Sequence, residues 1–202
     1  LKFKNKSADG KKEKIFLTVG RFFTSFLHEK KPDFLIDFFR LNYRNHFSGW
    51  KLFICGNLTE KSGREYVQTL RKIIIGLPIE LHVNLSFSKL TKIYSQASIY
   101  WHAAGVGFNP EKFPEKMEHF GITTIEAMSS GCVPITYAAG GQTDIVENNK
   151  SGFFFRDEDS LLKANLKLVI NPKLLKKMSL NAVKRAAYFS FGNFKRRLHE
   201  LV

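Results

Sequence analysis

The chain has 202 residues, of which 44% are hydrophobic and 14% aromatic, and it carries a formal net charge of +14. This composition is typical of a folded protein and excludes a disordered chain, and no apolar segment approaches the roughly 18 residues of a membrane-spanning helix. The N-terminus shows no signal-peptide pattern. Since the chain begins with Leu1 rather than methionine, we expect it to be a piece of a longer protein.

The positive charge is concentrated at the two ends of the chain. Residues 1–14 contain six lysines and two acidic residues, and residues 161–202 contain ten Lys or Arg and one acidic residue. We interpret residues 1–14 as a basic arm or linker and residues 15–202 as one folded domain. The basic ends are either ordinary solvated surface or contacts for an anionic membrane surface or a partner domain. We expect no nucleic-acid partner, because a nucleic-acid binder would interleave its basic residues with exposed aromatic ones across one face.

Between these ends, apolar strand-like segments alternate with helix-like segments. Strands are expected at "IFLTVG", "WKLFICG", "IELHVNL", "SIYWHA", "CVPITY" and "GFFF". Helices are expected at "PDFLIDFFRLNYRNHF", "REYVQTLRKIII", "FSKLTKIYSQA", after residue 121, and two or three times near the C-terminus. Short buried strands separated by amphipathic helices are typical of a parallel sheet with helices on both faces, so we predict an α/β fold.

The two cysteines, Cys55 and Cys132, each lie inside an apolar strand-like segment. Lone cysteines of this kind are typical of small core residues in a reducing compartment rather than of a disulfide or a metal site. We expect no metal site, because no His, Cys and Asp residues cluster at ligand spacing. These features favour a cytoplasmic location. One interpretation of the basic ends is that they contact the inner leaflet of a membrane peripherally.

Basic residues follow the first predicted strand. In parallel sheets, ligands bind beyond the carboxyl ends of the strands. Arg21 comes directly after Gly20 at such an end, and its planar guanidinium suits a phosphate. Lys30 and Lys31 precede the next helix and could add a point charge at the same place. Taken alone these residues are weak evidence, and a solvated surface arginine is the alternative.

The segment "EHFGITTIEAM" places Glu118 and Glu126 on either side of an expected helix start between Gly121 and Thr123. The N-terminus of a helix offers unpaired N–H groups and a positive dipole end to an anion. Both carboxylates would then face one cleft, where they can accept hydrogen bonds from sugar hydroxyls. A phosphate between hydroxyl-rich rings describes a nucleotide sugar. The alternative is that Glu118 is a solvated loop residue and Glu126 complements the helix dipole.

The segment "EHFGITTIEAMSSGCVPITYAAGGQTDIVENNKSGFFF" resembles the signature of the retaining family 4 glycosyltransferases. That signature combines two glutamates separated by seven residues with the frame E-x-F-G…E-A-M…G-x-P…G-G…I-V…G. The segments "FLTVGRFF", "SKLTKIYSQASIYWHAAG" and "YFSFGNFKRRLHELV" resemble other parts of the same family, so that the resemblance covers about residues 15–202.

The resemblance implies the C-terminal, Rossmann-like half of a two-domain GT-B fold. The function it implies is retaining transfer of a sugar from a nucleoside-diphosphate sugar, UDP- or GDP-linked, without a metal or another cofactor. It further implies that a missing N-terminal domain holds the acceptor, so that the isolated domain would transfer little sugar. The alternatives are a GT-B-type sugar-nucleotide epimerase and a non-catalytic sugar-nucleotide-binding module.

The resemblance also implies roles for single residues. Glu118 would face the transferred sugar, while Arg21 and Lys30 would clamp the pyrophosphate, with Lys31 as the fallback; these are the expected catalytic residues. Glu126 would accept hydrogen bonds from the ribose hydroxyls. Further donor contacts are expected from Phe120, Gly121, Ile122 and Thr123, and contacts to the base from the backbone at 84–85. His102, after the strand "SIYWH", is either a contact of the donor sugar or a core histidine.

Overall fold

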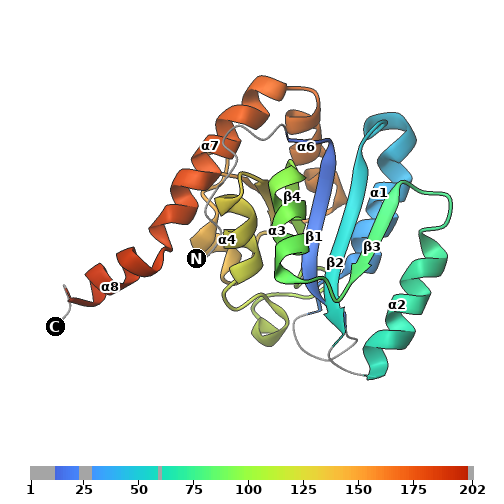
Figure 1. The fold of residues 1–202 in the computed structure, drawn as a ribbon, viewed down its shortest axis with the longest axis horizontal. Coiled ribbons are helices and arrows are strands. Elements are labelled where there is room, and N and C mark those ends of the chain that lie inside the picture. The colour runs from blue at the N-terminus through green and yellow to red at the C-terminus, as the bar shows by residue number, and fades with distance from the viewer. Residues whose placement is uncertain (1–11, 23–28, 59–60, 200–202) are drawn as a thin grey trace.

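The computed structural model describes residues 12–22, 29–58 and 61–199, and within them six strands form one parallel sheet in the order β3-β2-β1-β4-β5-β6 (Figure 1). The strands are β1 (Ile15–Phe22), β2 (Lys51–Leu58), β3 (Ile79–Val83), β4 (Ile99–His102), β5 (Val133–Tyr137) and β6 (Phe153–Phe155). The predicted parallel sheet is confirmed. Residues 1–11 of the expected arm lie outside the described residues.

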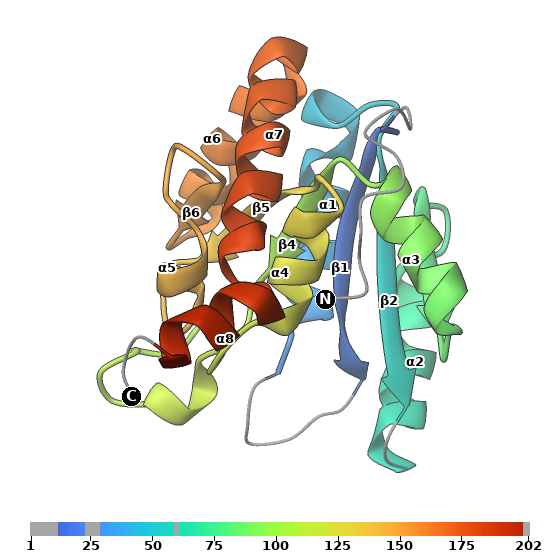
Figure 2. The ribbon, with the colours of Figure 1, turned by 60° about the vertical axis from the view of Figure 1, so that its left-hand side comes forward.

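Helices cover both faces of the sheet, as the alternating pattern predicts (Figures 1 and 2). One face is packed by α1 (Pro32–His46), α2 (Lys61–Ile73) and α6 (Glu158–Val169). The other is packed by α3 (Phe87–Gln96) and α4 (Ile122–Ser129), and α7 (Pro172–Tyr188) packs against α4. The remaining helices are the 3-10 turn η1 (Pro114–Lys116), the single turn α5 (Gln142–Ile145) and α8 (Phe191–His199), which extends away from the sheet.

Aromatic side chains dominate the larger core. The ring of Phe16, on β1, stacks against Trp50 at 4.5 Å and Trp101 at 4.2 Å between ring centroids. The buried indole N–H of Trp101 donates to Oδ1 of Asn165 on α6 at 2.9 Å, so the polar atom of this side chain is satisfied. These contacts hold α6 and the centre of the sheet together.

Strand order reverses between β1 and β4, which lie side by side although β2 and β3 intervene in the sequence. At such a reversal the connections leave in opposite directions, and the carboxyl ends of the two strands border a crevice where ligands bind. Arg21 is the penultimate residue of β1 and His102 is the last residue of β4, so the topology places both residues beside the crevice.

The start of α4 is brought to the same crevice by Gly121. This residue has φ 90° and precedes Ile122, the first residue of the helix, so the expected helix start is confirmed. A Cβ atom at Gly121 would overlap the side-chain nitrogen of Gln142. The hydroxyl of Thr124 donates to Oε1 of this buried Gln142 at 2.9 Å, which ties the first turn of α4 to α5.

Lys12, the first described residue, is docked against the body of the domain. Its ammonium donates to the carbonyl oxygens of Tyr94 at 3.1 Å, Ala97 at 2.7 Å and Ser130 at 2.6 Å. These oxygens lie at the C-terminal ends of α3 and α4, where the helix dipole is negative. Lys12 therefore joins the two helices on this side of the sheet.

Candidate functional site

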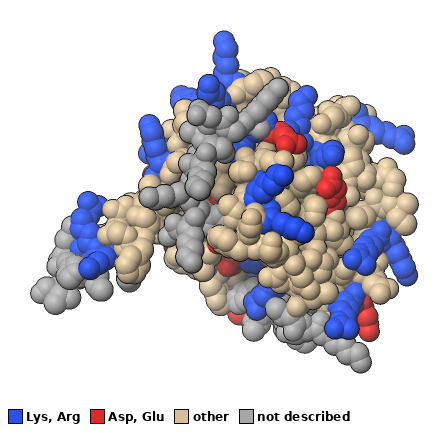
Figure 3. Space-filling model, viewed as in Figure 1, with Lys and Arg blue, Asp and Glu red and all other residues tan. Residues whose placement is uncertain are grey.

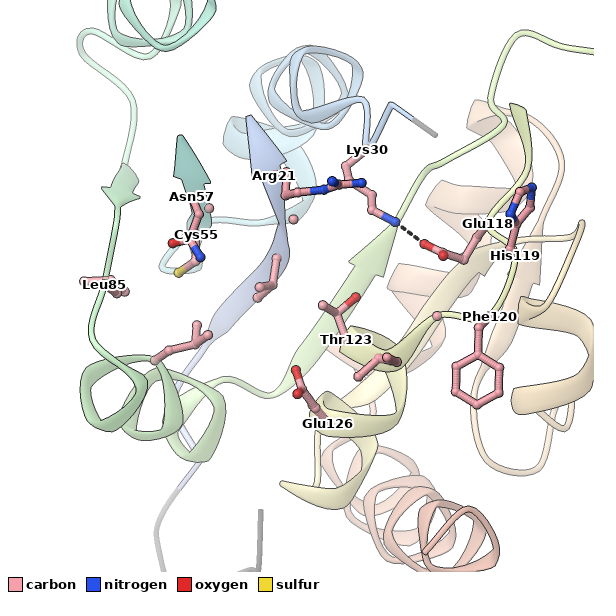
Figure 4. A pocket seen from close by; sticks show the side chains of 16 residues that line it. Arg21, Lys30, Cys55, Asn57, Leu85, Glu118, His119, Phe120, Thr123 and Glu126 are labelled. Atoms are coloured by element: carbon pink, nitrogen blue, oxygen red, sulfur yellow. Dashed lines mark hydrogen bonds and ion pairs between the residues drawn. The ribbon is translucent and has the colours of Figure 1, made fainter. Parts of the chain in front are cut away.

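A cavity of about 490 Å³ lies at the carboxyl edge of the sheet, between β1, β2, α3 and the start of α4 (Figure 4). The structure brings together in it all eight residues that the sequence predicts for the site. These are Arg21, Lys30, Glu118, Phe120, Gly121, Ile122, Thr123 and Glu126. Arg21 is predicted because it follows a strand. Gly121, Ile122 and Thr123 are predicted because they mark a helix start, since such positions meet at one edge of a parallel sheet. The other members are predicted with the help of the family resemblance.

Glu118 lies between two nitrogen groups. The ammonium of Lys30 forms an ion pair with its Oε2, and Nε2 of His102 lies 2.9 Å from the same oxygen. The Glu118 side chain is 13% exposed, that of Lys30 18% and that of His102 1%. Burial by itself would raise the pKa of Glu118, but the hydrogen bond from His102 and the charge of Lys30 outweigh it and hold that pKa well below its usual range. Glu118 is therefore an ionised carboxylate at neutral pH.

Lys30 and Lys31 point to different places. Lys31 has left-handed backbone geometry, with φ 51°, and its ammonium pairs with Glu29 at 2.9 Å. Lys30 instead reaches into the cavity, and its Cγ occupies the space that a side chain at Gly20 would fill. Of the two candidates, Lys30 is thus the one that lines the cavity.

Two buried tyrosines support the wall opposite Lys30. The hydroxyl of Tyr94, on α3, donates to Oε2 of Glu126 at 3.2 Å, and that of Tyr100, on β4, donates to Oγ1 of Thr123 at 2.8 Å. Burial raises the pKa of both tyrosines, so both remain hydrogen-bond donors. Burial also raises the pKa of Glu126. Sequence reasoning missed both tyrosines, because an aromatic residue in an apolar segment carries no signal that separates a supporting hydroxyl from ordinary core.

The arrangement suits an anion at the centre of the cavity. Arg21 and Lys30 extend over one side, and the first turn of α4, with Thr123, lies across from them (Figure 4). The first N–H groups of a helix have no intrahelical acceptor and point out of its end. Two cationic side chains and a helix N-terminus facing one space are groups that can bind phosphate-type anions.

The end of the cavity beyond Arg21 is lined by Cys55, Asn57 and Leu85 (Figure 4). Burial raises the pKa of the Cys55 thiol to about 12, so it is protonated and serves as an apolar wall. Leu85 lies where the sequence predicts contacts to a nucleotide base. The side-chain oxygen of the adjacent Asn84 accepts from the N–H of Leu58 at 2.8 Å, which fixes the loop between β3 and α3 against β2.

His102 is a buried residue behind Glu118, so the structure places it in the core and not on the cavity wall. Among the described residues, no three His, Cys, Asp or Glu side chains are grouped so as to hold a metal ion. The sequence contains one Asp-x-Asp pair, Asp157 and Asp159, away from the cavity; Asp157 caps α6 by accepting from the N–H of Ser160 at 2.7 Å. No helix of the described ranges is long and apolar enough to span a bilayer.

Comparisons with known proteins show the family of this chain. The family model described as "Glycosyl transferases group 1" matches residues 1–185. A GDP-Man:Man(3)GlcNAc(2)-PP-Dol alpha-1,2-mannosyltransferase of Xenopus tropicalis is 30% identical over 151 residues, which are 71% of this chain and 29% of that protein. The chain thus spans less than a third of the length of this relative.

Solved structures share the fold. The pneumococcal O-GlcNAc transferase GtfA, in complex with UDP and GlcNAc, is 21% identical with a TM-score of 0.72 over 96% of this chain and 36% of that one. The C-terminal domain of a glycosyl transferase group 1 family protein, LpcC from Francisella tularensis, is 17% identical with a TM-score of 0.65, over 88% of this chain and 87% of that one. The predicted fold, the Rossmann-like C-terminal half of a GT-B protein, is confirmed. The chain belongs to the glycosyl transferases group 1 family.

Proposed function

We propose that this chain is the donor-binding domain of a glycosyltransferase that takes a sugar from a nucleoside diphosphate and passes it to an acceptor held by a separate N-terminal domain. The observation that carries the proposal is the convergence of Arg21, Lys30 and the start of α4 on one cavity, with Glu118 and Glu126 at its sides. The diphosphate lies between the cations and the helix. Glu126 then accepts hydrogen bonds from the ribose hydroxyls, and Glu118 accepts hydrogen bonds from the hydroxyls of the transferred sugar.

The chemistry follows from the charge that the leaving group gains. As the bond between the anomeric carbon and the phosphate oxygen breaks, negative charge grows on the diphosphate, and fixed donors around it stabilise the transition state more than the ground state. Lys30 leaves Glu118 for the phosphate. The acceptor oxygen bonds to the anomeric carbon on the same face, with retention of configuration, and its proton passes to the leaving phosphate oxygen. The cations and the helix end take the place of a metal ion in this scheme.

The relatives favour a GDP-linked mannose as the donor. Four mannosyltransferases, each with GDP-Man in its name, match 56–72% of this chain at 28–32% identity. Solved structures of the same fold hold UDP, at lower identity. GDP-mannose is therefore the first donor to test. We also infer a cytoplasmic protein whose basic ends contact an anionic membrane surface.

The test is calorimetric titration of this chain with GDP, UDP and ADP, with and without EDTA. Saturable binding of GDP that EDTA does not change is the expected result. Lys30→Ala is expected to weaken GDP binding by about tenfold to hundredfold, which is the loss of one or two charge-assisted hydrogen bonds, and to affect GMP less. Lys31→Ala, a cation next in sequence that points elsewhere, is the matched control. Absence of saturable nucleotide binding, or equal losses from both substitutions, would contradict the proposal.

A further inference from the structure

The side of Glu118 that faces away from the cavity is occupied by a histidine to which the proposed reaction gives no role. His102 is the last residue of β4, and its Nε2 lies 2.9 Å from Oε2 of Glu118. The ammonium of Lys30 meets the same oxygen from the cavity side. One carboxylate oxygen therefore has a buried partner that stays in place and an accessible partner that a bound diphosphate can attract.

The position of the proton between His102 and Glu118 can be assigned. An imidazole nitrogen at this distance from a carboxylate must carry a proton, because two acceptors would repel each other. Burial lowers the pKa of His102 and the charge of Lys30 adds to this effect; together they outweigh the hydrogen bond and the charge of Glu118, which act to raise it, so the ring is neutral. A neutral ring has one N–H. With that proton on Nε2, the Nδ1 atom is an acceptor that needs a donor.

Thr136 is the neighbour of His102 on β5 and carries a hydroxyl of the required kind. Nδ1 of His102 and Oγ1 of Thr136 are both buried and without a hydrogen-bond partner in the part of the chain that the structure describes. The two residues are register partners on the adjacent parallel strands β4 and β5, so their side chains project from the same face of the sheet. Buried polar atoms without partners are rare and costly, and these two are chemically complementary.

We propose that the hydroxyl of Thr136 donates to Nδ1 of His102, across one buried water or after a small rotation of the threonine side chain, and so holds His102 as the Nε2–H tautomer that orients Glu118. His102 and Thr136 are positioning residues, because neither lines the cavity. The consequence rests on the proposed function. When the donor's diphosphate draws Lys30 away, His102 keeps Oε2 in place, and the carboxylate presents its other oxygen to the sugar.

The first test is independent of any ligand. Nitrogen-15 NMR of the uniformly labelled chain reports which imidazole nitrogen carries the proton, and His102→Gln identifies the signals of His102. The expected result is a neutral ring with a protonated Nε2 and an unprotonated Nδ1 from pH 6 to pH 8. A proton on Nδ1 of the neutral ring, or a charged ring in this range, would overturn the inference.

The second test separates the sugar from the diphosphate. Thr136→Val is expected to weaken GDP-mannose binding about threefold to tenfold and to leave GDP binding unchanged, because only the sugar depends on an oriented Glu118. Thr136→Ser restores the hydroxyl and is expected to restore the affinity. Thr18→Val, at a buried threonine of β1, is the matched control. Equal losses for both ligands, or no rescue by serine, would contradict the role.

The two tests also separate this inference from the proposed function. If the unsubstituted protein binds neither GDP nor GDP-mannose, the donor-binding function fails. The tautomer of His102 still decides whether the proposed hydrogen bonds from Thr136 to His102 and from His102 to Glu118 exist. If the chain binds both ligands but His102 carries its proton on Nδ1, the function stands and this inference fails. Thermal unfolding of each variant shows that a loss of binding is not a loss of folding.

Discussion

Two titratable residues at the carboxyl edge of the sheet, Glu118 and His102, have pKa values lowered by the fold, for different reasons. Glu118 gains partners for its charged form, whereas burial of His102 disfavours the charged form. Both shifts mean that the unfolded chain binds protons at a pH where the native chain does not. The free energy of unfolding therefore rises with pH across the windows between the unfolded and the folded pKa values.

This linkage predicts acid sensitivity in two stages. As the pH falls through 6.5, the unfolded chain protonates His102 while the native chain, in which Glu118 and Lys30 face the ring, does not. Stability is thus expected to fall by up to about 1.4 kcal/mol per pH unit, and further below about pH 4.5, where protonation of Glu118 begins in the unfolded chain. Urea unfolding between pH 7.5 and pH 5 measures the first stage. An equal slope in His102→Gln would show that another group is responsible.

At the scale of single elements, the start of α4 is the feature on which the site depends most. Its first turn needs a residue with positive φ and no side chain, because the backbone of Gly121 passes directly over the amide of Gln142. That close approach positions the free N–H groups of the helix at the cavity. In the motif E-x-F-G, the glycine is therefore needed for its positive φ and its close approach to Gln142, while the glutamate is needed for its carboxylate.

Substitution of Gly121 tests this account of the element. Gly121→Ala is expected to lower the free energy of unfolding by more than the roughly 1–2 kcal/mol that positive φ alone costs an alanine, and to weaken GDP binding. The control is Gly49→Ala, where φ is 77° and no atom lies within 4 Å of the added Cβ. Urea unfolding of both variants gives the difference, which isolates the contact with Gln142. Equal losses in the two variants would mean that this contact is unimportant.

At the scale of the whole molecule, the charge is distributed unevenly. The segment from Pro172 to His199, which forms α7 and α8, contains no acidic residue. Four exposed lysines lie on α7: Lys173, Lys176, Lys177 and Lys184. Lys and Arg side chains also outnumber Asp and Glu over the face of the molecule seen in Figure 3. Such a region is complementary in charge to an anionic lipid surface, which is the basis of the membrane contact that we propose.

Vesicle co-sedimentation tests the inferred membrane contact. The chain is expected to bind vesicles that contain phosphatidylserine, not vesicles of phosphatidylcholine alone, and to lose binding as salt rises. Replacing Lys176 and Lys177 by serine is expected to weaken binding severalfold, at roughly 1 kcal/mol per lysine. Replacing Arg71 and Lys72 by serine is the control, because it removes the same amount of charge from α2 instead of α7. Equal loss from both pairs would indicate net charge alone, and no binding would exclude the contact.

Much of this molecule is determined locally by its sequence. Burial periodicity predicts the strands and helices, and Gly121 marks where α4 begins, because both depend only on residues close together in the chain. Once a parallel sheet is predicted, its strand ends must share an edge, which places Arg21 at the site. Glu118 and Glu126 are assigned to the same site from the helix start between them and from the family resemblance, which both depend on residues close together in the chain.

Only the tertiary structure decided the partners of these residues. Which of Lys30 and Lys31 enters the cavity depends on the backbone turn before α1; the family resemblance favours Lys30, but the two residues themselves carry no signal that separates them. The hydroxyls of Tyr94 and Tyr100 and the imidazole of His102 meet residues that lie 16 to 32 positions away. Such contacts depend on how strands and helices pack, and hydrophobic periodicity carries no information about them, because a core aromatic and a hydrogen-bond donor occupy the same kind of position.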